Sequence, residues 1–167
     1  MKAIRGSLCA MLGFCAALPA FAQQAEDAAA IEKSYGLLAA GCLEAHDNST
    51  ITQVERQQTC ESEVVQLNVY FNARPNPSPH ERNMMFMHRG FLRLEAGGAM
   101  TLQDGVRSRR VCESLEASWA DFSSIVDAGS PAAYQGTFNS LRTAVSQAVQ
   151  SCRNDFGKSA DAPPLLQ

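Results

Sequence analysis

The sequence predicts an all-α fold of about five antiparallel helices, arranged as helical hairpins, as a bundle or as a short repeat-like array, with two disulfides. Apolar residues recur at steps of three and four in five segments, which is the period of one helical face. No segment alternates β-branched and polar residues with period two, as a half-buried strand would. Short polar links separate the five segments, and helices joined by short links pack antiparallel.

Residues 1–22 have the layout of a secretory signal peptide. Lys2 and Arg5 precede an apolar run over 8–18, and small residues lead to an expected cleavage after Ala22. No later stretch approaches the roughly 20 apolar residues that a transmembrane helix needs. We therefore expect a periplasmic or secreted protein without membrane insertion after signal cleavage.

The mature chain is expected to be one acidic domain. Loss of the signal removes Lys2 and Arg5 but no acid, so the formal charge moves from −3 to −5. This charge argues against nucleic acid as a partner, because phosphate binding requires a basic surface. Residues 23–156 suit a single helical domain with one core. The segment 157–167 contains two adjacent prolines and little periodicity, so it is predicted to be a disordered tail.

Four cysteines remain after cleavage, and an even number in an exported chain indicates two disulfides. They are Cys42, Cys60, Cys112 and Cys152. Three pairings are open, and we expect Cys42 with Cys60 and Cys112 with Cys152, because each pair falls on helices that are neighbours in sequence. No Cys-x-x-Cys occurs, so thioredoxin-like, paired-cysteine zinc and c-type haem sites lack their signature.

The first two helices are predicted from apolar spacing and from one capping motif. Alanine-rich sequence with helical spacing predicts a helix over 26–45, and turn-forming residues follow at 46–49. Thr52 and Glu55 then form a capping box, in which each side chain satisfies a free amide at a helix start. The second helix is expected to run to about Ala73, before two prolines.

The third helix has a clear start. Ser78 is the predicted cap, Pro79 occupies the first helical position, and Glu81 is expected to close a capping box. Gly97 and Gly98 are expected to end this helix, because glycine tolerates the left-handed conformation of a C-terminal cap.

The fourth helix is predicted from Thr101 to Val126, opened by Thr101 and Asp104. Five residues form an apolar stripe on one face: Cys112, Leu115, Trp119, Phe122 and Val126. Six charged residues are expected to keep the opposite face in water: Arg107, Arg109, Arg110, Glu113, Glu116 and Asp121. The other helices must cover the stripe.

The fifth helix is predicted after Ser130 and Pro131, which again place a serine cap before a proline at the first helical position. Apolar residues at helical spacing continue from Tyr134 to Cys152. The helix is expected to end at about Phe156.

The tripeptide Cys-Glu-Ser occurs twice, at 60–62 and 112–114, each time in the second helix of a predicted hairpin. Val54 and Val106 precede the two copies at the same offset. This short echo indicates either two copies of one hairpin unit or chance.

The sequence His-Arg-Gly at 88–90, followed by Gly97, resembles the Arg-Gly and later Gly of tetratricopeptide repeats. Residues 42–60 also resemble the cysteine-bearing leader hairpin before such repeats in exported bacterial proteins. The resemblance covers about 42–111, and it implies stacked helical hairpins that bind peptides or partner proteins. Leu102 stands where the family has alanine, and one repeat is visible.

One constellation on the third helix suits a metal. His80, Met84 and His88 are spaced i, i+4, i+8, with Met87 beside them, and imidazole and thioether groups suit copper(I). Met84 and Met87 also lie on the apolar stripe of this helix, where methionine is an ordinary core residue. We favour the core interpretation and predict no metal and no cofactor.

Arginines on the third and fourth helices are the candidate partner-binding residues. They are Arg89, Arg93, Arg107, Arg109 and Arg110. A basic surface on an acidic protein suits an anionic partner or an acidic peptide. The alternative is an ordinary solvated face, in which these arginines pair with Glu81, Glu95 and Glu113.

The sequence contains no nucleophile elbow, metalloprotease helix, P-loop or dinucleotide-binding glycine pattern. We therefore predict an exported non-enzymatic helical protein that acts as a protein or peptide interaction module, with an unknown partner. Two alternatives remain open. One is a small periplasmic copper-binding protein, and the other is an inhibitor or immunity-type partner of a secreted effector.

Overall fold

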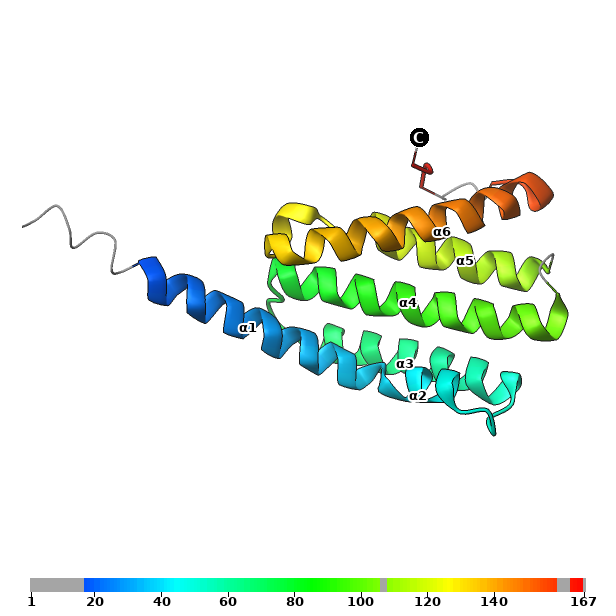
Figure 1. Ribbon diagram of the computed structural model, residues 1–167, viewed down its shortest axis with the longest axis horizontal. Coiled ribbons are helices and arrows are strands. Elements are labelled where there is room, and N and C mark those ends of the chain that lie inside the picture. The colour runs from blue at the N-terminus through cyan, green and yellow to red at the C-terminus, as the bar shows by residue number, and fades with distance from the viewer. Residues whose placement is uncertain (1–16, 106–107, 159–162, 167) are drawn as a thin grey trace, which may run out of the picture.

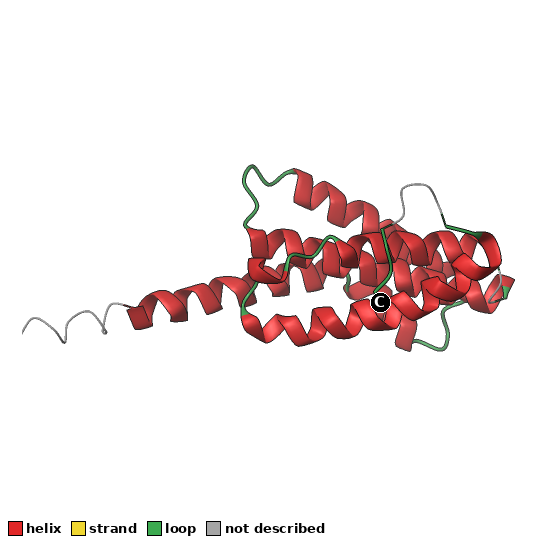
Figure 2. Cartoon of the chain, turned by 90° about the horizontal axis from the view of Figure 1, so that it is seen from above, coloured by secondary structure: helices red, strands yellow, loops and turns green. Residues whose placement is uncertain are grey.

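The computed structural model describes residues 17–105, 108–158 and 163–166, and this part of the chain forms six α-helices and no strand (Figures 1 and 2). The α-helices are α1 (Ala17–Leu38), α2 (Ala40–Asp47), α3 (Gln53–Asn72), α4 (Pro79–Asp104), α5 (Arg109–Ser123) and α6 (Gln135–Phe156). Two 3-10 turns, Asp127–Gly129 and Ala132–Tyr134, connect α5 to α6. The prediction of an all-α fold is confirmed.

Helix α4 is the centre of the fold. It packs between α3 and α5, α1 lies across α4 and α3, and α6 covers the outer side of α5 (Figure 1). The predicted disulfide pairing is confirmed: Cys42 bonds to Cys60 between α2 and α3, and Cys112 bonds to Cys152 between α5 and α6. Each disulfide thus fastens an outer helix to one of the two direct neighbours of α4.

The core lies along both sides of α4. Its largest fully buried apolar side chains come from five helices: Tyr35, Leu67, Met84, Leu92, Trp119, Phe122 and Phe138. Trp119 and Phe122 belong to the predicted stripe of α5 and are buried as expected. Val126, predicted on the same stripe, is 64% exposed, because α5 ends at Ser123 and the chain turns before Val126.

The single helix predicted over 26–45 is interrupted at Ala39, between α1 and α2. Glu63 of α3 explains the interruption, since its carboxylate accepts hydrogen bonds from the backbone N–H groups of Gly41 (2.8 Å) and Cys42 (2.9 Å). These amides open α2, so a side chain from another helix caps it. Helix α1 also begins at Ala17, earlier than predicted, and the expected cleavage after Ala22 falls within it.

The predicted helix stop at Gly97 and Gly98 is wrong, because α4 continues through both residues to Asp104. A Cβ on Gly97 would lie 3.5 Å from the side chain of Ser114, an ordinary contact, whereas a Cβ on Gly90 would lie 3.0 Å from the ring of Phe122, so the close approach of α5 depends on Gly90. Thr101 lies inside α4 and its hydroxyl donates to the carbonyl of Gly97. The chain instead turns at Gly105, whose φ is +85°.

Two of the predicted helix starts are confirmed. Thr52 and Glu55 form the complete capping box of α3. The Ser78 hydroxyl accepts from the backbone N–H of Glu81, with Pro79 in the first turn of α4. The carboxylate of Glu81 does not close a box as predicted, because it is held by Arg74.

The predicted start of the last helix at Ser130 is wrong. Helix α6 begins at Gln135, after the 3-10 turn Ala132–Tyr134, and the Ser130 hydroxyl is engaged by α4 instead. The expected end at Phe156 is confirmed. The sequence predicts disorder over 157–167, but in the described part of this tail the Pro163 carbonyl accepts from Arg153 at 2.8 Å.

Across the described residues, none of the helices has the length and apolar character needed to cross a membrane.

Candidate functional site

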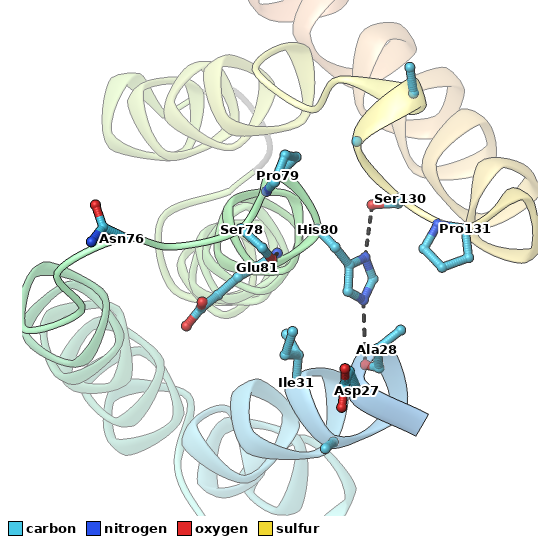
Figure 3. Close-up of a pocket in the computed structure, with 13 residues that line it drawn as sticks. Asp27, Ala28, Ile31, Asn76, Ser78, Pro79, His80, Glu81, Ser130 and Pro131 are labelled. Atoms are coloured by element: carbon cyan, nitrogen blue, oxygen red, sulfur yellow. Dashed lines mark hydrogen bonds between the residues drawn. The ribbon is translucent and has the colours of Figure 1, made fainter. Parts of the chain in front are cut away.

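A pocket of about 720 Å³ lies where α1, the start of α4 and the connection between α5 and α6 meet (Figure 3). We call it the α4 pocket. Its walls include the apolar side chains of Ala28, Ile31, Pro79 and Pro131, and His80 points into it from α4. The volume falls in the range of small-ligand and peptide side-chain pockets.

His80 joins all three segments around the α4 pocket (Figure 3). Its Nδ1 lies 2.9 Å from the hydroxyl of Ser130, and its Nε2 lies 3.4 Å from the carbonyl oxygen of Ala28. A carbonyl only accepts, so Nε2 carries the proton, and Nδ1 accepts from the Ser130 hydroxyl. Burial lowers the pKa of His80, which keeps the ring neutral at pH 7. This histidine therefore links α1 to the body of the protein.

Asn83 holds the connection between α5 and α6 onto α4. Its Nδ2 donates to the carbonyl of Val126 (2.7 Å) and to the hydroxyl of Ser130 (2.8 Å), and its Oδ1 accepts from the backbone N–H of Val126 (3.0 Å). A Cβ on Gly129 would lie 3.1 Å from the same Nδ2, so the loop passes close to this amide. These bonds fix one wall of the α4 pocket.

The carboxylates and phenols near the α4 pocket are also engaged. Glu81 binds Arg74 at 2.8 Å and accepts from the hydroxyl of Tyr35 at 3.4 Å. The hydroxyl of Tyr134 donates to Glu32 at 2.6 Å, and burial together with this carboxylate raises the pKa of Tyr134 to about 12. The polar groups named here thus hold the segments together, and the pocket is a preformed hollow whose lining combines apolar and polar side chains.

The four metal candidates are either packed in or against the core or engaged in hydrogen bonds within the chain. His80 uses both ring nitrogens within the chain. Met84 is fully buried in the core, and Met87 packs against the core. His88 stacks on Tyr35 beneath α1, with its Nε2 buried and without a partner, and burial lowers its pKa to about 4. No group of three His, Cys, Asp or Glu side chains in the described residues is arranged to hold a metal ion.

Arg89 and Arg93 bind a carboxylate of the same chain. Arg89 donates through Nε (2.9 Å) and Nη2 (2.6 Å) to one oxygen of Asp121, and Arg93 donates to the other oxygen at 2.7 Å. Arg89 also reaches Asn68 of α3. Asp121 is 2% exposed, so the prediction that it faces water is wrong. The two arginines therefore tie α3, α4 and α5 together.

The remaining arginines lie at the other end of α5. Arg110 pairs with Asp104 at 3.1 Å, and the Arg109 guanidinium lies 5.5 Å from the ring centre of Phe156. Arg107 lies outside the described residues. Among the described candidates, Arg89 and Arg93 are thus bound to Asp121, whereas Arg109 and Arg110 lie at the other end of α5.

A second hollow, of about 390 Å³, lies beside Arg109. We call it the α5 hollow, and its lining comprises Arg109, Cys112, Glu113, Glu116, Phe156, Gly157 and Lys158. The disulfide between Cys112 and Cys152 fastens its two walls, α5 and α6.

Sequence reasoning missed the polar residues that organise these regions. Asp121, Asn83 and Glu63 are buried, although their residue types are usually exposed. One signal for Asp121 was its position between Trp119 and Phe122, which places it at the edge of the buried stripe. The partners of Asn83 and Glu63 lie on other helices and leave no local pattern.

The fold and these two hollows define a class: a small all-α domain in which two disulfides fasten outer helices around a central one. Comparisons with protein-family models, with curated proteins and with solved structures found no match.

Proposed function

We propose that this chain is an exported helical protein that binds another protein or a peptide without catalysing a reaction. The observation that carries the proposal is the pair of disulfides, Cys42 to Cys60 and Cys112 to Cys152, which brace the helices on both sides of α4. A body braced in this way loses little conformational freedom on binding, so more of the contact energy appears as affinity.

The order of the helices supports the same proposal. From α2 to α6, consecutive helices pack as antiparallel neighbours, and α1 packs on α4, the first helix of the following hairpin. Such side-by-side hairpins are the architecture implied by the resemblance to tetratricopeptide repeats, whose members bind peptides and proteins. Two disulfides also favour an oxidising compartment, in agreement with the predicted export.

We place the contact surface at the start of α5, around Arg109 and Arg110. Both residues are exposed, whereas Arg89 and Arg93 are committed to Asp121. Exposed arginine is favoured at protein interfaces, because its guanidinium forms paired hydrogen bonds with carboxylates.

Photo-crosslinking in the cell envelope tests the proposal. A photoreactive amino acid in place of Glu113, which is exposed beside Arg109, is expected to give one discrete adduct with another protein. The adduct is expected to disappear when Arg109 and Arg110 are changed to Glu, and to persist in the matched control Lys33→Glu, a reversal of an exposed cation on α1. An adduct that persists when both arginines are changed to Glu would contradict the placement of the contact surface around Arg109 and Arg110. Steady turnover of a substrate by the purified protein would contradict the proposal that it binds a partner without catalysing a reaction.

A further inference from the structure

The α5 hollow combines two features that together point to a particular ligand. Its cations are Arg109 of α5 and Lys158, which follows α6, and the partly exposed ring of Phe156 lines the hollow with them. An apolar surface flanked by cations suits a peptide segment that carries both acidic and apolar side chains.

The described residues around the α5 hollow leave an excess of positive charge. Both oxygens of Glu116 are taken by Arg153, at 2.7 and 2.8 Å, so this carboxylate is neutralised. Glu113 is the other acid in the lining, and it is exposed. Among the described residues, neither Arg109 nor Lys158 has a carboxylate within ion-pair distance. Two cations thus face one exposed carboxylate on a protein whose net charge is negative.

Arg109 is held in a position suited to binding a carboxylate. Its guanidinium lies 5.5 Å from the ring centre of Phe156, and contact with an aromatic face leaves the N–H groups of the guanidinium edge free to donate. The neighbouring Arg110 is less available, because its guanidinium already donates a hydrogen bond to Asp104. The walls that carry Arg109 and Phe156 are joined by the disulfide of Cys112, so the site is preformed.

Building on the proposed function, we infer that the α5 hollow is the docking site for an acidic peptide segment of the partner. One carboxylate of that segment binds Arg109 and Lys158, and a neighbouring apolar side chain covers Phe156. A charge-assisted contact of this kind gives specificity and a marked dependence on salt.

Fluorescence anisotropy with two synthetic peptides tests this inference. The probe is a labelled, amidated octapeptide of alternating Glu and Leu, and its counterpart has Gln in place of Glu. The protein is expected to bind the Glu peptide at least tenfold more tightly than the Gln peptide. Arg109→Glu and Phe156→Ala are each expected to weaken binding of the Glu peptide about tenfold, which corresponds to about 1.4 kcal/mol.

The controls separate binding from folding and from overall charge. Lys33→Glu changes the net charge equally but lies on α1, so it is expected to leave the affinity within twofold. Arg109→Gln, a milder change at an exposed position, is expected to bind weakly while keeping the circular dichroism of the wild type. Equal affinity for the two peptides, or unchanged binding by Arg109→Glu, would overturn the inference.

The two proposals can fail separately. If crosslinking yields a partner but the protein binds the two peptides equally, the proposed function stands and this docking site is refuted. Peptide binding at the hollow without an envelope adduct would support the site and count against the proposed function.

Discussion

The carboxylate of Glu63 on α3 caps the first turn of α2 through the backbone N–H of Gly41, at 2.8 Å. A Cβ on Gly41 would lie 2.6 Å from the same carboxylate oxygen, so only glycine fits without movement. Because Cys42 also donates to Glu63, the cap lies directly beside the first disulfide. This contact determines where the N-terminal helix breaks and how α2 meets α3.

Gly41→Ala is expected to lower the free energy of unfolding by about 1–3 kcal/mol, because the methyl group displaces the Glu63 carboxylate. Gly136→Ala is the matched control, since nothing lies within 4 Å of a Cβ there and alanine favours a helix. It is expected to leave stability unchanged or slightly raised. Urea unfolding of both variants measures the difference. Equal stability of the two variants would refute the role of Glu63 as the cap of α2.

Asp121→Asn is expected to lower the free energy of unfolding by about 3 kcal/mol, because two guanidiniums lose their shared buried carboxylate. Glu113→Gln removes an exposed carboxylate from the same helix and is expected to change stability by less than about 0.5 kcal/mol. Chemical denaturation compares the two. A similar small effect at both positions would mean that Arg89 and Arg93 do not depend on Asp121.

The stability of the protein is expected to fall in acid partly through His88. Burial lowers its pKa to about 4 in the folded protein, whereas an exposed histidine titrates near 6.5. The unfolded chain therefore binds a proton first, and the contribution of His88 to stability is lost as the pH falls from about 6.5 to 4. The full loss is about 3 kcal/mol.

The effect of His88 is measured as a difference, because carboxylates also titrate in this range. Urea unfolding of the wild type and of His88→Phe, from pH 7 to pH 4, should show a shallower decline for the variant. Phenylalanine keeps an aromatic ring beside Tyr35 but cannot be protonated. Parallel declines would show that His88 is not buried as described.

The two disulfides are expected to contribute unequally. The loops they close span 18 and 40 residues, which corresponds to about 3 and about 4 kcal/mol of stabilisation in the chain-entropy account. Paired Cys→Ser variants measure each contribution by urea unfolding. Peptide mapping without reduction checks the connectivity, and a Cys60 to Cys112 linkage would contradict the packing order around α4.

Local signals in the sequence were sufficient for the helical class, the capping box of Thr52 and the disulfide pairing. They failed where a residue type has two structural uses. Gly97 predicts a helix stop, but α4 continues through it and packs against Ser114 of α5. Local spacing cannot separate these roles, because the deciding contact with Ser114 lies on another helix.

The candidate site was harder to predict than the fold, for a related reason. The sequence groups five arginines because they lie on neighbouring helices, yet the guanidiniums of Arg89 and Arg93 are bound to Asp121. The ring beneath Arg109 belongs to Phe156, 47 positions further along the chain in the printed sequence. Pairings between distant segments leave no trace in periodicity or composition.

The salt dependence of partner binding tests the central claim most directly. The protein captured by crosslinking would be titrated against the wild type and against the Arg109→Glu, Arg110→Glu variant at increasing ionic strength. The account predicts that the wild type loses affinity steeply as salt rises, and that the variant binds at least tenfold more weakly at low salt with a flatter dependence. Equal affinity and an equal salt slope for the two proteins would contradict it.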